Sequence, residues 1–68
     1  MRNCLRDLRK ARGLSQADLA EAIEVSRQTI NAVEADKYDP SLPMAYKLAA
    51  FLGVPVEELF YNPFRDRG

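Results

Sequence analysis

The sequence predicts an all-α fold, a compact bundle of five short helices in a single domain that spans residues 1–68. Apolar residues recur at intervals of three and four along most of the chain, which is the spacing of one helix face. Serines stand where helices would begin, and glycines stand where helices would end. The chain is too short for a second domain, and its hydrophobic fraction of 47% is typical of a folded protein.

Residues 3–12 are predicted to form the first helix. Leu5 and Leu8 fall at helical spacing and face the interior, whereas most of the arginines in this stretch fall on the outer faces. Gly13 follows the last turn, where glycine readily adopts the left-handed conformation that ends a helix. Leu14 then packs under the next helix.

Residues 15–23 and 26–35 carry two short helical patterns joined by a tight connection. The first begins at Ser15, where an acidic residue three positions later completes a capping box. The second begins at Ser26, a favourable N-cap residue, and has one apolar stripe formed by Ile30 and Val33. Two short helices joined in this way form a helix-turn-helix, here over residues 15–35.

The second helix of this motif carries polar residues outside its apolar stripe. Arginine can pair bidentately with guanine in the DNA major groove, and glutamine or asparagine can pair with adenine. We therefore predict that Arg27, Gln28 and Asn31 read bases. A merely solvated polar face is the alternative, but a run of polar residues directly after a tight turn favours contact with DNA.

The DNA backbone is expected to lie against the starts of these helices, because the free N–H groups of a helix N-terminus attract phosphate. Gln16, in the first turn of the helix over 15–23, can add a side-chain hydrogen bond to the same phosphate. Ser26 and Thr29 are assigned to backbone contact at the start of the second helix. Thr29 can alternatively touch a thymine methyl group.

Residues 42–52 and 55–60 are predicted to form the fourth and fifth helices. Ser41 caps the fourth helix and Gly53 ends it, while Pro55 suits the first turn of the fifth. The inward residues of the two helices are expected to be Leu42, Ala45, Leu48, Ala49, Leu52 and Leu59.

Aromatic residues gather near the end of the chain, where little core is left to cover them. Apolar clusters of this kind mark contact surfaces, so we expect a homodimer whose interface lies within about residues 51–64. The alternation of Phe60, Asn62 and Phe64 also indicates a short β-pairing beside residues 1–3. The residues assigned to the dimer interface are Phe51, Phe60, Tyr61 and Phe64.

The composition narrows the classes of function. Ten basic and ten acidic residues give zero net charge, which argues against non-specific coating of nucleic acid. The chain has no histidine and no pairing of a nucleophile with a base, so an enzyme is not expected. No set of metal ligands, cofactor site or small-molecule site is recognisable. The single cysteine, Cys4, and the lack of a membrane-spanning or signal-peptide pattern indicate a cytoplasmic protein.

The helix-turn-helix and the segments around it resemble the XRE-type helix-turn-helix transcriptional regulators, the family of the small phage repressors. The similarity covers roughly residues 5–60, but the family usually has glycine at the turn position of Glu24, where the backbone often needs a positive φ. The residues that carry it are Gln16, Ala20, Val25, Ser26, Ile30, Glu34 and Lys37, followed by Leu42, Leu48, Leu52, Gly53 and Leu59.

The resemblance implies further roles. In this family a basic residue at the place of Arg9 pairs with the acid at the place of Glu34, and this pair braces the first helix against the recognition helix. The loop after the recognition helix grips the DNA backbone in relatives, which implies backbone contacts by Lys37 and Tyr38. Packing of Tyr38 against Pro40 is the alternative for that residue. Small repressors of the family dimerise through the last helix and its tail.

We therefore expect a sequence-specific transcriptional regulator that binds double-stranded DNA. It would act as a repressor, with a homodimer reading the major groove of a two-fold operator. The alternative is an antitoxin or co-regulator subunit whose main role is to bind a partner protein through the aromatic residues of 60–64. Neither interpretation involves a membrane, a cofactor or a small-molecule substrate.

Overall fold

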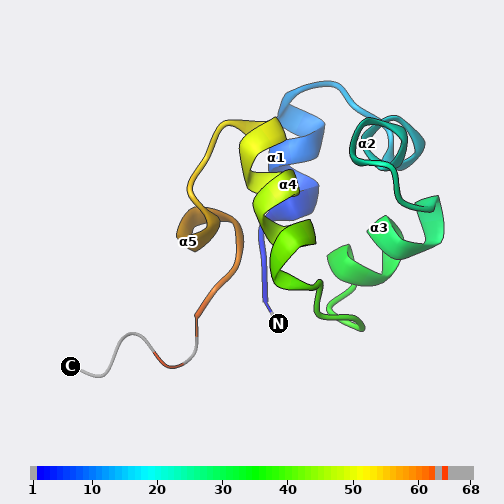
Figure 1. The fold of residues 1–68 in the computed structure, drawn as a ribbon. Coiled ribbons are helices and arrows are strands. Elements are labelled where there is room, and N and C mark those ends of the chain that lie inside the picture. Colours follow the sequence, from blue (N-terminus) through cyan, green and yellow to red (C-terminus); the bar gives the residue numbers. More distant parts are fainter. Residues whose placement is uncertain (1, 63, 65–68) are drawn as a thin grey trace.

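The computed structural model describes residues 2–62 and residue 64 of the 68-residue chain. The predicted five helices are present as α1 (Leu5–Ala11), α2 (Gln16–Ile23), α3 (Arg27–Glu34), α4 (Leu42–Leu52) and α5 (Val56–Leu59). In Figure 1, α1 and α4 lie at the centre of the view, α2 and α3 lie on one side of them, and α5 lies on the other. No helix in this part of the chain has the length and apolar character needed to cross a membrane.

Serine caps set the starts of three helices. The side-chain oxygens of Ser15, Ser26 and Ser41 each accept a hydrogen bond from the backbone N–H three residues later. At Ser15 the capping box is complete, because the Asp18 carboxylate accepts the Ser15 N–H at 3.0 Å. Each cap satisfies an N–H that the helix itself leaves without a partner, which is why these helices begin where the sequence predicts.

The core is built from one apolar face of each helix. Ile30 and Val33 of α3 are buried as predicted, and so are the expected inward residues of α4 other than Leu42. Leu42 is 64% exposed, so its assignment to the core is wrong. It is the first residue of α4, and its side chain lies at the rim of the bundle. The buried apolar residues are Leu5, Leu19, Ala20, Ile23, Ile30, Val33, Met44, Ala45, Leu48, Ala49, Leu52, Leu59 and Phe60.

The two ends of the described chain pair with each other. Asn3 and Phe60 form an antiparallel β-bridge. Next to it, the N–H of Cys4 donates to the carbonyl of Leu59 at 3.0 Å, and the N–H of Tyr61 donates to the carbonyl of Arg2 at 2.8 Å. The expected β-pairing of the termini is therefore present as a bridge, while residues 1 and 63 lie outside the described residues.

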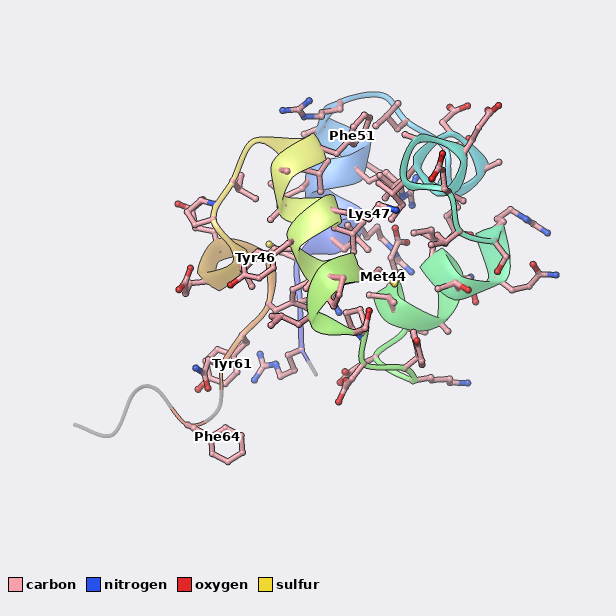
Figure 2. The ribbon with its side chains drawn as sticks, viewed as in Figure 1. Met44, Tyr46, Lys47, Phe51, Tyr61 and Phe64 are labelled. Carbon is pink, nitrogen blue, oxygen red and sulfur yellow. The ribbon has the colours of Figure 1, made fainter. Side chains whose placement is uncertain are left out.

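This pairing gives Phe60 a different role from the one expected. Its side chain is 5% exposed and belongs to the core of its own chain. The expectation that no core remains to cover Phe60 is wrong, because the backbone bridge to Asn3 brings this residue back against the bundle. Tyr61 and Phe64 are 52% and 81% exposed, and Figure 2 shows them along the segment that leaves the bundle.

Candidate DNA interface

The connection between α2 and α3 fixes how the two helices of the motif meet. Glu24 ends α2 with φ 63° and ψ 46°, so it adopts the left-handed conformation that glycine usually supplies at such a position. The N–H of Val25 donates to the carbonyl of Ala20 at 2.9 Å, and the N–H of Glu24 donates to the carbonyl of Glu21 at 3.2 Å. The turn of the motif is therefore formed without glycine.

The outer face of α3 begins directly after this turn. Arg27, Gln28 and Asn31 are exposed, whereas Ile30 and Val33 on the opposite face are 0% and 1% exposed. Arg27, Gln28 and Asn31 line a surface hollow of about 290 Å³ together with Gln16 of α2. The residues predicted to read bases thus lie together on one accessible face.

Ser26 and Thr29 lie at the start of α3 and bond to each other. The Ser26 hydroxyl accepts the N–H of Thr29 at 3.1 Å, and the two hydroxyl oxygens lie 2.8 Å apart. Ser26 is exposed and Thr29 is half-buried. The Ser26 hydroxyl therefore caps α3, and the Thr29 hydroxyl bonds to this cap.

Lys37 and Tyr38 lie just past the end of α3, on the segment that leads to α4. Asp36 has φ 62°, and the N–H of Lys37 donates to the carbonyl of Ala32 at 2.9 Å, which closes the helix end. The side chains of Lys37 and Tyr38 are both exposed, that of Tyr38 to 48%. The loop therefore presents a cation and an aromatic ring to solvent beyond the C-terminal end of α3.

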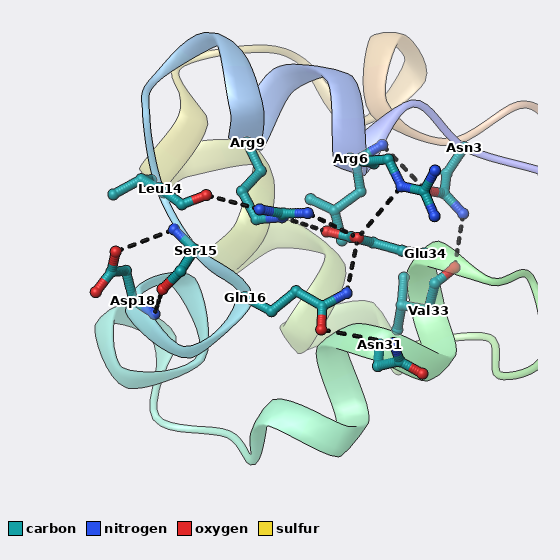
Figure 3. A network of polar contacts seen from close by, with 11 residues as sticks. Asn3, Arg6, Arg9, Leu14, Ser15, Gln16, Asp18, Asn31, Val33 and Glu34 are labelled. Carbon is teal, nitrogen blue, oxygen red and sulfur yellow. Dashed lines mark hydrogen bonds and ion pairs between the residues drawn. The ribbon is translucent and has the colours of Figure 1, made fainter.

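Behind the outer face, an ion pair joins α1 to α3. The Arg9 guanidinium donates to the Glu34 carboxylate, with Nε–Oε2 at 2.6 Å and Nη2–Oε1 at 3.2 Å. This confirms the predicted pair, which is shown in Figure 3. Nη1 of Arg9 also donates to the carbonyl of Leu14 at 2.7 Å. The side chains of Arg9 and Glu34 are only 9% and 1% exposed, so the pair fixes the orientation of α3 against α1.

Gln16 is half-buried, and its amide contacts two residues of α3. Its Nε2 donates to Oε1 of Glu34 at 3.1 Å, and its Oε1 accepts a hydrogen bond from Nδ2 of Asn31 at 3.5 Å. One amide N–H of Gln16 remains for a phosphate. The contact between Gln16 and the DNA backbone stays a prediction.

Two carboxyl groups in this region have altered acidity. Burial raises the pKa of Glu34, but the hydrogen bonds from Arg9 and Gln16 and the charges of Arg9 and Arg6 outweigh burial, so the pKa lies below its usual value. The hydrogen bond from the Ser15 N–H, followed by that from the Ser15 side chain, lowers the pKa of Asp18. Both carboxyl groups are therefore stabilised in the ionised form by contacts that exist only in the folded chain.

Three contacts that position the helices were not foreseen from the sequence. Each joins a side-chain donor to a carbonyl at the C-terminal end of a helix, where carbonyls lack partners within the helix. No local signal marks these contacts, because donor and acceptor lie 24 to 40 residues apart. The contacts are Arg12 Nη2 to Leu52 O at 2.7 Å, Lys47 Nζ to Ile23 O at 3.1 Å, and Asn3 Nδ2 to Val33 O at 2.9 Å.

The residues assigned to a dimer interface are spread over the molecule. Phe51 on α4 is 39% exposed, and Figure 2 shows it at the opposite end of the view from Tyr61 and Phe64. The Tyr61 ring lies under the Arg2 guanidinium, at 5.5 Å from the ring centre. The structure therefore keeps Phe51 apart from Tyr61 and Phe64.

Comparison with known proteins places this geometry in a family. The family model described as Helix-turn-helix (HTH_3) matches residues 5–59. An uncharacterized HTH-type transcriptional regulator of Methanocaldococcus jannaschii is 52% identical over 60 residues, which cover 88% of this chain and 91% of that protein. The cryptic phage CTXphi transcriptional repressor RstR of Vibrio cholerae is 44% identical over 55 residues, which cover 81% of this chain and 50% of that protein.

A solved structure supports the same assignment. The restriction-modification controller protein C.AhdI from Aeromonas hydrophila superposes with a TM-score of 0.76 and 41% sequence identity, over 82% of this chain and 85% of that one. The helix-turn-helix turn, the caps of α2 and α3 and the buried ion pair behind α3 all lie within the matched residues. The chain belongs to the XRE-type helix-turn-helix family of DNA-binding transcriptional regulators.

Proposed function

We propose that this chain regulates transcription by sequence-specific binding of α3 in the DNA major groove. The observation that carries the proposal is the arrangement of α3, in which Ile30 and Val33 are buried while Arg27 and Gln28 are exposed on the other side. Neither of these two side chains bonds to another residue that the structure describes. Their donors and acceptors are therefore available for base edges, with Arg27 suited to guanine and Gln28 to adenine.

Contacts to phosphate would set the position of α3 in the groove. The N-terminal turns of α2 and α3 provide free N–H groups, and Gln16, Ser26 and Thr29 lie at or near these turns. Lys37 and Tyr38 lie beyond the other end of α3 and would reach the backbone on the far side of the groove. Such contacts orient the protein and contribute to binding of any sequence, whereas base contacts give specificity.

The proposal includes repression by a homodimer that occupies a two-fold operator. The named phage repressor among the relatives supports repression. Exposed Tyr61 and Phe64 support a contact between copies, whereas Phe51 lies apart from them. Phe60 is buried in its own chain and would contribute to that contact only indirectly, by keeping the neighbouring Tyr61 beside the bundle. Two recognition helices in such a dimer would lie about 34 Å apart, one turn of duplex DNA.

Selection from a pool of random DNA duplexes tests the proposal. We expect an enriched sequence with two half-sites related by a two-fold axis and separated by about one helical turn. Sedimentation of the free protein should show a dimer that Tyr61→Ser weakens. A chain that enriches no sequence, and that sediments as a monomer until a different protein binds its tail, would favour the antitoxin or co-regulator function instead.

A further inference from the structure

Asn3 joins three segments of the chain that are far apart in the sequence. Its Nδ2 donates to the carbonyl of Val33 near the end of α3 at 2.9 Å, as Figure 3 shows. Its Oδ1 accepts the N–H of Leu5, the first residue of α1, at 3.0 Å. Its backbone forms the β-bridge with Phe60. Asn3 and Phe60 both lie outside residues 5–59, which the family model matches, so this junction is not part of the family pattern.

The two side-chain partners of Asn3 fix the orientation of its amide. Both partners are backbone groups of fixed polarity, since a carbonyl only accepts a hydrogen bond and an N–H only donates one. The reversed amide would lose both bonds. Cys4, the N-cap residue of α1, makes no side-chain cap bond, so the Asn3 oxygen satisfies an N–H at the start of α1 in its place. The half-buried side chain of Asn3 therefore holds the start of α1 against the end of α3.

The segment that follows α5 holds the backbone of Asn3 on both sides. Before Asn3, the carbonyl of Arg2 accepts the N–H of Tyr61 at 2.8 Å. After Asn3, the N–H of Cys4 donates to the carbonyl of Leu59 at 3.0 Å. Because these bonds set the path of the chain at Asn3, they also set where its side chain can reach. Displacing the segment after α5 would remove this support from the bond between Asn3 and α3.

The α3 end of the junction lies beside the loop proposed to contact the DNA backbone. The carbonyl of Val33 also accepts the N–H of Asp36 at 3.1 Å, and the N–H of Lys37 donates to the carbonyl of Ala32 at 2.9 Å. The side chains of Lys37 and Tyr38 are exposed directly after these bonds. The position of the last turn of α3 therefore decides where this loop meets DNA.

We propose that Asn3 is a positioning residue that couples the segment at Phe60 and Tyr61 to the C-terminal end of α3. Pairing of this segment with Asn3 promotes DNA binding, and its displacement weakens DNA binding. The inference rests on the proposed function, because its consequence is measured on the same DNA-binding face. Such coupling is reciprocal. The contact between copies proposed for the exposed Tyr61 and Phe64 and the binding of DNA by α3 therefore influence each other through Asn3.

Variants at the two ends of the junction test the coupling. Tyr61→Pro removes the N–H that the carbonyl of Arg2 accepts. Tyr61→Ser is the matched control, because it loses the same ring and any contact the ring makes between copies but keeps the N–H. Asn3→Asp keeps the oxygen that accepts the N–H of Leu5 and replaces the donor to Val33 with a second oxygen.

The effect of Tyr61→Pro relative to Tyr61→Ser is measured in the wild-type and in the Asn3→Asp background, so the added charge of the aspartate cancels. The measurements are affinity for the selected operator and hydrogen exchange of the backbone N–H groups of Asp36 and Lys37. In the wild-type background, Tyr61→Pro should lower affinity and speed this exchange by about 2- to 10-fold, the range that one hydrogen bond provides. In the Asn3→Asp background the two Tyr61 variants should behave alike. Exchange in α2 should not change.

The outcomes separate this inference from the proposed function. An equal effect of Tyr61→Pro in both backgrounds would overturn the coupling and leave the proposed function intact. A wild-type chain that enriches no DNA sequence would overturn the proposed function, whereas hydrogen exchange would still decide whether Asn3 links the two segments. If Tyr61→Pro does not fold, the reciprocal measurement replaces it: Asn3→Asp should speed exchange of the Tyr61 N–H as well as those of Asp36 and Lys37. Unchanged exchange at Tyr61 would overturn the inference.

Discussion

The two faces of α3 differ in how completely the protein satisfies their polar groups. On the inner face, the Glu34 carboxylate accepts hydrogen bonds from Arg9 and Gln16 and is 1% exposed. On the outer face, Arg27 and Gln28 are exposed and bond to no other described residue. The inner face therefore holds the helix in place, and the outer face is left for a ligand.

The difference predicts which measurement each face should affect. Changes on the inner face should reduce the stability of the fold, because they leave buried polar groups without partners. Changes on the outer face should reduce DNA binding and leave stability nearly unchanged, since surface substitutions away from structural contacts change stability by no more than about 0.5 kcal/mol. Asn31 lies on the outer face and also contacts Gln16 of α2 at 3.5 Å.

Removing the partner of Glu34 should have the largest effect. Arg9→Met leaves the buried carboxylate unpaired and should lower the free energy of unfolding by about 3–5 kcal/mol, measured by urea denaturation at neutral pH. Arg6→Met is the matched control. Arg6 is 63% exposed and lies 3.9 Å from Glu34, so its loss should cost no more than about 1 kcal/mol. Equal stability of the Arg9 variant and the wild-type chain would contradict a structural role for the pair.

Acidification should lower the free energy of unfolding by less than Arg9→Met does, because a protonated Glu34 remains hydrogen-bonded. The pKa of Glu34 is lower in the folded chain than its unfolded value of about 4.3. The ion pair should therefore stabilise the fold fully above that pH and lose its contribution as the pH falls through the lower, folded pKa. Asp18 should add to the loss in the same direction.

Denaturation at a series of pH values between about 6 and 2 measures this loss. Glu34→Gln is the control, since it cannot titrate at this position. It should be less stable than the wild-type chain at neutral pH and should lose less stability on acidification. A wild-type chain whose stability does not fall over this range would show that Glu34 makes no net contribution in the ionised form.

On the outer face, Arg27→Ala should weaken operator binding by about 1–3 kcal/mol and relax the preference at one base position, because a bidentate contact with guanine is lost. Unfolding of the variant should match that of the wild-type chain. Binding is measured by titration of the selected operator and of single-base variants. A large loss of stability in Arg27→Ala would mean that this outer-face residue also supports the fold.

Lys37→Ala should have the smallest effect on DNA affinity, and that effect should depend least on the DNA sequence. Loss of one phosphate contact should weaken binding to all sequences alike and reduce the dependence of log affinity on log salt concentration by about one unit. Titrations of the operator and of one mutated operator at several salt concentrations provide the comparison with Arg27→Ala. A change in base preference with an unchanged salt dependence would assign Lys37 to base contact instead.

Features that depend on neighbours along the chain were predictable. The helix starts at Ser15, Ser26 and Ser41 depend on contacts three residues away, and the buried stripe of Ile30 and Val33 follows from helical spacing. The accessible face of α3 follows from the same spacing, because burying one stripe leaves the others outside. The Arg9–Glu34 pair was reached through family resemblance, since its members lie 25 residues apart.

Features that depend on distant segments required the tertiary structure. Phe60 is buried because the end of the chain pairs with Asn3, and the carbonyls that end α2 and α4 are satisfied by Lys47 and Arg12. The amide of Gln16 bonds to the buried Glu34, which periodicity alone could not show. Periodicity specifies which side of a helix is covered, whereas the identity of each partner depends on how the five helices are packed.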